Sequence, residues 1–303
     1  MDKPMASNLY THQDENVAKT WVLMALFLGV VIALGFAASW YFNSAGLLYF
    51  AVIFALVTNV WSYWNSDKLV LSVSRAHPAD PAQYQDLHHI VENLAITAGL
   101  PKPRIYIIDD PAPNAFATGR NKEHAAIAVT SGLLSMMDKN ELSGVLAHEL
   151  SHIGNRDILL STVAVVLVGF VALVSHFFLR ASFLGGGGGG RDRNGANALV
   201  AILAIAFMIL APVIATLLQL AISRKREFLA DASGALLTRY PEGLASALRK
   251  LGSYPAPMAH ANNATAHLFI SNPFGPGAAK SFITRIFSTH PPIEERIKAL
   301  LGN

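Results

Sequence analysis

Four long apolar runs constrain the fold of this chain more than any other feature of its sequence. No Asp, Glu, Lys or Arg interrupts any of them, and apart from tyrosine their only ionisable side chain is that of His176. A helix of about 20 apolar residues spans the hydrocarbon core of a bilayer. The sequence therefore predicts four transmembrane helices, at residues 21–42, 47–64, 158–179 and 198–222.

The composition agrees with an integral membrane protein. Hydrophobic residues make up 52% of the 303 residues, charged residues only 14%, and the mean hydropathy is +0.38, which is unusual for a soluble domain. The basic residues are scattered and lack interleaved aromatic residues, so we expect no binding of nucleic acid. The chain has no cysteine, which excludes disulfides and thiolate metal ligands and leaves His, Asp and Glu as the strong ligands.

The apolar runs divide the chain into membrane and soluble segments. The polar N-terminus is predicted to be a mobile tail, and the loop inside the second hairpin contains six consecutive glycines. The predicted segments are the tail 1–19, a transmembrane hairpin 20–64, a first soluble block 65–157, a second transmembrane hairpin 158–222 with its loop 180–197, and a second, C-terminal soluble block 223–303.

Periodicity in the two soluble blocks predicts a mostly helical α+β fold. Residues 104–110 and 124–130 are rich in β-branched and small apolar residues and are predicted strands, with a short extended segment between them at 113–119. We expect this three-stranded sheet to pack on a helix at 139–153, which begins after Asp138 in a variant of the capping box. Further helices are predicted at 81–98, 226–238, 243–251 and 293–301, and an irregular loop at 252–281.

The helix at 139–153 carries a possible metal site. His148 and His152 are four residues apart, so both imidazoles project from one face of the helix and can bind the same ion. The carboxylate of Glu149 can reach a water on the metal without becoming a ligand. The pattern therefore predicts a catalytic zinc site with Glu149 as general base. A chance match of two histidines is the alternative, and a third protein ligand is needed to exclude it.

Glu227 is the candidate third ligand. It lies four residues before Asp231, so the two carboxylates share a helix face, and Asp231 can accept the second ring N–H of a zinc-bound histidine. An ordinary solvated helix start is the alternative, with Glu227 offsetting the three cations that precede it. The topology favours the ligand, because two membrane crossings between His152 and Glu227 return both to the same membrane face.

The distribution of basic residues predicts which membrane face carries the site. If the N-terminus is cytoplasmic, 20 of the 23 Lys and Arg residues lie on that side, and only Arg180, Arg191 and Arg193 lie outside. Cytoplasmic loops of membrane proteins carry such an excess of basic residues. We therefore expect both the N-terminus and the active site to be cytoplasmic.

Several motifs in combination resemble one family. The metal-site helix continues into Gly-Asn-Arg-Asp at 154–157, and the chain also contains Asn-Ala-Phe-Ala at 114–117, Arg-Glu-Phe-Leu-Ala-Asp at 226–231 and His-Pro-Pro at 290–292. Over its full length the chain resembles the HtpX family of bacterial heat-shock membrane metallopeptidases. The related prenyl-protein proteases share these motifs but have more membrane spans, so they fit less well.

The resemblance implies an activity, a cofactor and a location. A member of this family is a zinc endopeptidase of the gluzincin type in the bacterial inner membrane, where it acts in the stress response on misfolded or damaged membrane proteins. By this likeness, one zinc ion is bound by His148, His152 and Glu227, and Glu149 is the base. The implied partners are polypeptide substrates and the lipid bilayer.

Three further positions have a functional and a structural interpretation. His290 is a candidate donor to the oxyanion of the reaction, or it caps the helix that follows Pro291. Asn114, Ala115, Phe116 and Ala117 could present an open strand edge to an extended substrate, or they form an ordinary edge strand. Asp157 could support the metal site, or it marks the membrane boundary.

Two other functional classes remain as alternatives. In a non-enzymatic membrane chaperone or scaffold the metal would be structural, but structural zinc sites usually have four protein ligands and the sequence offers three with a clear geometric reason. A transporter with polar sites inside the membrane is disfavoured, because the four spans contain only His176 as an ionisable group.

Overall fold

A computed structural model describes residues 9–41, 43–167, 169, 224–262, 264–275 and 291–302. Within this part of the chain, two helical segments are long and apolar enough to cross a membrane, Asp14–Ala37 and Ala45–Val73. The start of the third predicted span lies in a shorter apolar helix, Asp157–Leu167. The rest of the second predicted hairpin, including the glycine-rich loop, lies outside the described residues.

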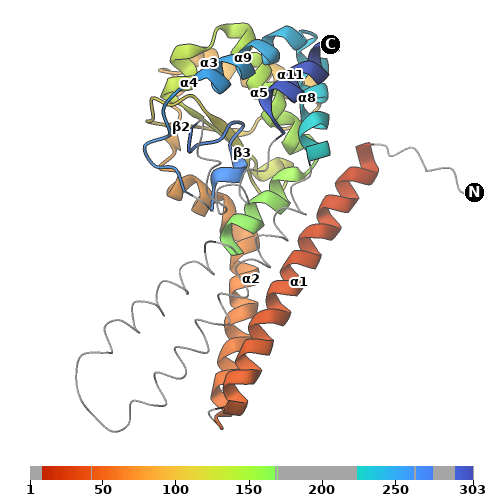
Figure 1. The fold of residues 1–303 in the computed structure, drawn as a ribbon, viewed down its shortest axis with the longest axis vertical. Helices are drawn as coiled ribbons and strands as arrows, with labels where there is room; N and C mark the ends of the chain where they lie inside the picture. The colour runs from red at the N-terminus through yellow and green to blue at the C-terminus, as the bar shows by residue number, and fades with distance from the viewer. Residues whose placement is uncertain are drawn as a thin grey trace, which may run out of the picture.

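Helices α1 (Leu9–Tyr41) and α2 (Ala45–Val73) lie side by side and project together from the rest of the molecule (Figure 1). Their outward side chains are large and apolar, and Trp40 and Phe50 are 80% and 68% exposed. Such a surface is suited to lipid rather than to water. A helical hairpin is therefore present where the first two apolar runs predict one.

Both helices extend beyond the predicted spans. The prediction of a mobile tail at 1–19 is wrong from Leu9 onward, because α1 begins there and its polar first turns contact the globular part through the buried side chain of Asn16. α2 also continues past its predicted end, and in this extension Asp67 is buried and accepts a hydrogen bond of 2.6 Å from Arg104. The hairpin is thus joined to the globular part through buried polar contacts.

The globular part contains a four-stranded sheet in the order β1-β2-β4-β3. β2 and β4 are parallel, and the other two pairs are antiparallel. The three predicted strands are present, but the prediction of a three-stranded sheet is wrong by one strand. The missed strand, β1, has only two residues, one of them proline, so it shows no periodicity. The strands are β1 (His77–Pro78), β2 (Arg104–Ile108), β3 (Ala115–Thr118) and β4 (Ala126–Thr130).

Helix α5 (Lys139–Gly154) lies at the centre of the globular part and contacts α3, α8, α9 and β3. The predicted capping box is confirmed, because Asp138 accepts from the backbone of Asn140 and Glu141, and Glu141 accepts from the backbone of Asp138. The surrounding helices are α3 (Gln85–Ala98), α4 (Ser131–Met136), α8 (Arg224–Thr238), α9 (Pro241–Ser253) and α11 (Ile293–Leu301), with 3-10 turns η1 (Lys122–His124) and η2 (Ala266–Leu268).

Both faces of the sheet are covered. One face packs against α5 in a core that includes Ile107, Ile127 and Leu146, each 0% exposed. On the other face, Phe116 packs edge-on against Phe269, with ring centroids 5.0 Å apart. The sheet therefore fixes α5 from one side and the segment around η2 from the other.

Glycines let two helices approach α5 closely. A Cβ at Gly234 of α8 would lie 2.9 Å from the backbone N of His148, and a Cβ at Gly144 of α5 would lie 2.7 Å from the backbone N of Leu244 in α9. Real side chains do not fit at such distances, so only glycine allows this packing. The approach of α8 at Gly234 brings the first turn of that helix over the histidine face of α5.

Candidate metal centre

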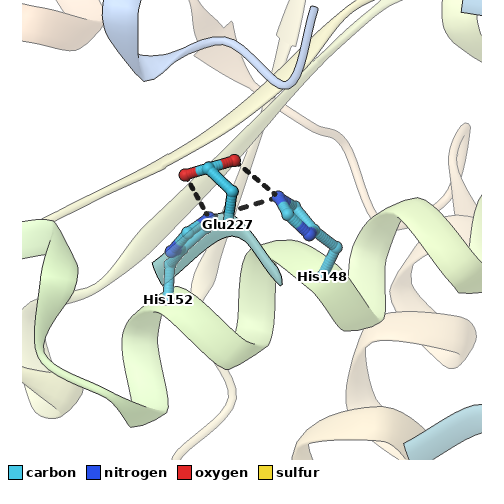
Figure 2. Close-up of side chains that lie close together, drawn as sticks. All are labelled: His148, His152 and Glu227. Atoms are coloured by element: carbon cyan, nitrogen blue, oxygen red, sulfur yellow. Dashed lines mark hydrogen bonds and ion pairs between the residues drawn. The ribbon is translucent and has the colours of Figure 1, made fainter. Parts of the chain in front are cut away.

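Three side chains from two helices converge at the centre of the globular part (Figure 2). His148 and His152 project from α5, and Glu227 comes from the first turn of α8. The two Nε2 atoms are 3.2 Å apart, and the Glu227 carboxylate oxygens lie 3.8 Å from Nε2 of His148 and 3.7 Å from Nε2 of His152. One ligand atom from each residue lies within 4.8 Å of the others. The structure therefore brings the three predicted ligands together.

Two carboxylates orient the imidazoles toward this point. Nδ1 of His148 lies 2.9 Å from Asp231, and Nδ1 of His152 lies 2.9 Å from Asp157. A ring that donates from Nδ1 keeps its lone pair on Nε2, which is how a metal-binding histidine is usually held. Two imidazoles, one carboxylate and two outer carboxylates form a donor set suited to zinc. Both outer residues were among the sequence-based candidates.

Burial and charge control protonation at the centre. Burial lowers the pKa of His148 to about 4, so this imidazole is neutral at pH 7. Burial acts in the same direction on His152, but the neighbouring Asp157 and Glu227 outweigh it and raise the pKa to about 9. The negative potential that attracts a proton to His152 attracts a metal cation equally well, and the two compete for the same lone pair.

Glu149 lies beside the ligands and is 1% exposed. Burial raises the pKa of its carboxyl group to about 7, although the neighbouring His152 and the backbone N–H of Ala117 in β3 act in the opposite direction. Glu149, His152 and Glu227 line one pocket together with Ala117 and His267. A carboxylate with a pKa near neutrality can both accept and return a proton at physiological pH, which is the property that a general base requires.

Comparison with known proteins assigns the chain to a family. Peptidase family M48 matches residues 81–303. The chain belongs to this family. It is therefore a metallopeptidase, and the matched region contains all three candidate ligands and Glu149.

Relatives of this M48 peptidase match it over nearly its whole length. A "Protease HtpX homolog" from Caldanaerobacter subterraneus is 48% identical over 96% of this chain and 97% of the relative. Others of that name, from Thermoanaerobacter pseudethanolicus and Thermococcus sibiricus, are 49% and 47% identical over 96% and 93% of this chain and 97% and 94% of the relatives. The resemblance to the HtpX family is confirmed.

A solved structure shares the fold. The crystal structure of Ste24p from S. mikatae superposes with a TM-score of 0.51 and 20% sequence identity. The superposition covers 96% of this chain and 67% of Ste24p. The mostly helical fold with its small sheet is thus found in another protein of low sequence similarity.

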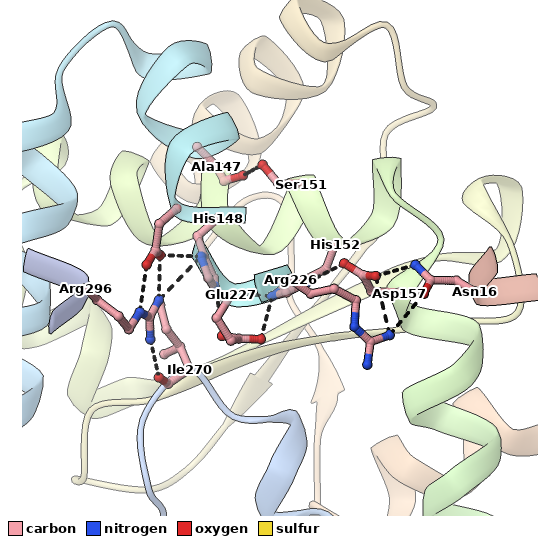
Figure 3. Close-up of polar contacts among 11 residues, drawn as sticks. Asn16, Ala147, His148, Ser151, His152, Asp157, Arg226, Glu227, Ile270 and Arg296 are labelled. Carbon is pink, nitrogen blue, oxygen red and sulfur yellow. Dashed lines mark hydrogen bonds and ion pairs between the residues drawn. The ribbon is translucent and has the colours of Figure 1, made fainter. Parts of the chain in front are cut away.

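The sequence did not reveal Arg296 of α11 as a site residue of the M48 peptidase. Its guanidinium group is fully buried and donates to both carboxylate oxygens of Asp231, at 2.8 and 2.6 Å, and to the carbonyl of Ile270 at 3.2 Å (Figure 3). Arg296 thus neutralises the carboxylate that orients His148. Its only sequence signal is a basic residue in a short amphipathic helix, which is ordinarily a solvated position.

Two residues beside Asp157 were also missed. Nη1 of Arg226 lies 3.6 Å from Asp157, and Nδ2 of Asn16 donates to the same carboxylate at 2.6 Å (Figure 3). Arg226 belongs to the cationic run before Glu227, and Asn16 to the segment predicted as a tail. Both depend on contacts between distant segments, which residue spacing cannot indicate.

The predicted substrate edge is only partly open. The side chain of Asn114 is buried and bonds to both backbone groups of Ser271, and the carbonyl of Ala115 accepts from the backbone N–H of Ile270 at 2.9 Å. Phe116 is a core side chain. Of the four residues, Ala117 alone lines the pocket that contains Glu149. His290 lies outside the described residues.

Proposed function

We propose that this M48 peptidase is a zinc-dependent membrane endopeptidase that hydrolyses peptide bonds of misfolded or damaged membrane proteins. The convergence of His148, His152 and Glu227 beside the buried carboxylate of Glu149 carries this proposal. Two histidines and one glutamate leave a coordination position open, as catalytic zinc sites do and closed structural sites do not. The proposed cofactor is one zinc ion per chain.

The protein's own groups supply the proton transfers. A bound zinc ion would act as a Lewis acid that activates water and polarises the scissile carbonyl. Glu149 accepts the proton of the attacking water, and the same carboxyl group then returns it to the leaving amine. Asp231 and Asp157 hold His148 and His152 in the orientation that the ligands need.

Substrate binding is proposed at the edge of β3. Ala117 lies at that edge and faces the pocket, so its backbone is placed to pair with an extended polypeptide. The backbone N–H of Ala117 also lowers the pKa of the Glu149 carboxyl group, so an extended substrate at this edge would lie close to the base. His290 remains the proposed donor to the oxyanion.

The proposed setting is the cytoplasmic face of the bacterial inner membrane, with four transmembrane helices. The exposed apolar surfaces of α1 and α2 support an anchor in lipid. The metal centre lies in the globular part, from which these helices project (Figure 1). In this setting the site would be close to the bilayer but outside its hydrocarbon core. The excess of basic residues on one side supports the cytoplasmic orientation.

Substitution of Glu149 by glutamine tests the activity. The amide keeps the shape of the side chain but cannot take up a proton, so we expect one zinc per chain and a rate of cleavage lower by about 100- to 10,000-fold. Purified protein is assayed by metal analysis and by hydrolysis of an unfolded polypeptide. The matched control is Glu92→Gln, a substitution in an exposed glutamate of α3 that pairs with Lys102.

The two possible failures separate the competing functions. Wild-type protein that binds zinc and cleaves nothing would favour a chaperone or scaffold with a structural metal. Equal cleavage by wild type and Glu149→Gln would show that another group is the base. The Glu92→Gln control should match the wild type in both zinc content and rate.

A further inference from the structure

We propose that Asn16 is a positioning residue for the metal centre, so that α1 belongs to the active site as well as to the membrane anchor. This inference rests on the proposed function, because it concerns the zinc ligands named there. The observation behind it is a buried contact between the polar first turns of α1 and the outer carboxylate of Asp157 (Figure 3).

The amide of Asn16 joins three segments of the chain. The side chain is 3% exposed, and Nδ2 donates to the carbonyl of Asn155 at 3.2 Å and to Oδ1 of Asp157 at 2.6 Å. Its Oδ1 accepts from Nη1 of Arg226 at 3.2 Å. Donor and acceptor are therefore both used, by the turn that ends α5 and by the first turn of α8.

These contacts connect Asn16 with two of the three candidate ligands, His152 and Glu227. Asn16 bonds to one oxygen of Asp157, and the other oxygen lies 2.9 Å from Nδ1 of His152. The carboxylate is held at both ends, so the bond from Asn16 restricts its rotation and thereby the direction of the imidazole. On the other side, Arg226 immediately precedes Glu227 in α8. Asn16 thus fixes α5 and α8 relative to each other where they share the metal.

The side-chain type matters as well as the contact. An aspartate at position 16 would still accept from Arg226, but it would place a second carboxylate against Asp157, where Nδ2 now donates. Like charges at this distance repel, and the carboxylate that orients His152 would be pushed out of place. An amide is the group that satisfies a carboxylate and a guanidinium at once.

A buried asparagine elsewhere in the hairpin provides the matched control. Asn59 of α2 is 7% exposed, and its Nδ2 donates to the carbonyl of Met24 at 3.2 Å, so it joins α2 to α1 without a contact to Asp157. Loss of either amide removes a buried hydrogen bond from the hairpin. Only the loss of Asn16 reaches the metal centre.

The experiment measures zinc binding by full-length protein in detergent. Every variant carries Glu149→Gln to suppress cleavage, and the dissociation constant for Zn²⁺ is obtained by competition with a chelator. Because changes to outer partners of ligands weaken metal binding by about 10- to 100-fold, we expect a loss of about tenfold for Asn16→Ala and at least as much for Asn16→Asp. Asn59→Ala should stay within about twofold of the parent.

The outcomes distinguish this inference from the proposed function. If the parent binds zinc and Asn16→Ala binds it equally well, the inference is overturned and the proposed function stands. Equal weakening in Asn59→Ala and Asn16→Ala would also overturn it, because the effect would then be general to the hairpin. A parent that binds no zinc would overturn both. In the active background, kcat should fall in Asn16→Ala at saturating substrate and recover with added zinc.

Discussion

Substitution of Gly234 by alanine tests how far the metal centre depends on the close contact between α5 and α8. An ideal Cβ at this position would lie 2.9 Å from the backbone N of His148 and 3.2 Å from the backbone carbonyl carbon of Ala147. Ordinary contacts between such atoms are about 3.5–4.0 Å. The backbone of α5 cannot yield as a side chain could, so α8 must move away by at least ~0.6 Å.

The Gly234→Ala substitution has two opposing effects on stability, and the movement of α8 displaces Glu227. Overpacking destabilises a fold by about 1–3 kcal/mol, whereas replacing glycine by alanine inside a helix stabilises it by about 1 kcal/mol. The net loss of stability should therefore be about 0–2 kcal/mol. Glu227 moves with α8, and a displacement of about 1 Å in a catalytic group can reduce a rate by about 100-fold. We expect kcat/KM of Gly234→Ala to fall by about 10- to 100-fold.

The assay compares cleavage rate, zinc affinity and melting temperature with those of a control glycine. Gly154 lies in the last turn of α5, and a Cβ there would lie in ordinary contact with Cδ1 of Leu100, at 3.8 Å. Gly154→Ala should keep wild-type activity and gain up to about 1 kcal/mol. Wild-type kcat/KM and zinc affinity in Gly234→Ala would refute the reasoning, because the ligands would then tolerate separation of the two helices.

Two further predictions concern buried charges. Replacement of Arg296 by methionine leaves the buried carboxylate of Asp231 without its cationic partner, so we expect the free energy of unfolding to fall by about 3–5 kcal/mol. Thermal unfolding measures this loss, and a second substitution, Asp231→Asn, should restore part of it. Glu141 is the other case: burial alone would raise its pKa, but hydrogen bonds from Lys250 and Ser246 outweigh burial and hold the pKa below the usual 4.5. Because the folded state has the lower pKa, the charged form stabilises the fold above pH 4.5, and this contribution is lost as the pH falls. Glu141→Gln should therefore lower the melting temperature by about 2–4 °C at pH 7 and by less at pH 4; an equal decrease at both values would contradict the assignment.

The convergence of the three candidate ligands could be predicted because their relationship is local or topological. His148 and His152 share a face by helical spacing alone, and Asp231 follows Glu227 by the same spacing. The link between the two pairs came from the predicted second hairpin, because two membrane crossings would return the chain to one face. The capping box at Asp138 is a local pattern too, and it was predicted correctly.

The site residues that the sequence did not reveal depend on contacts between distant segments. Arg296, Arg226 and Asn16 have their roles through packing of segments that are far apart in the chain, and no residue spacing encodes such a contact. The same limit applies to Asn114, for which the sequence left an open substrate edge and an ordinary edge strand as alternatives. It gave no sign of Ser271, whose backbone bonds to the Asn114 amide. The length of β1 explains its absence from the prediction, because two residues show no alternation.

The buried pair of Asp231 and Arg296 also has a consequence for the order in which the enzyme is made. Synthesis runs from the N-terminus, so the two histidines and both glutamates of the centre leave the ribosome before α11 does. Until Arg296 arrives, Asp231 is a carboxylate without a counter-charge, and burying it is strongly unfavourable. Docking of α11 therefore favours closure of the centre, and we expect proteolytic activity to develop only after this helix has docked.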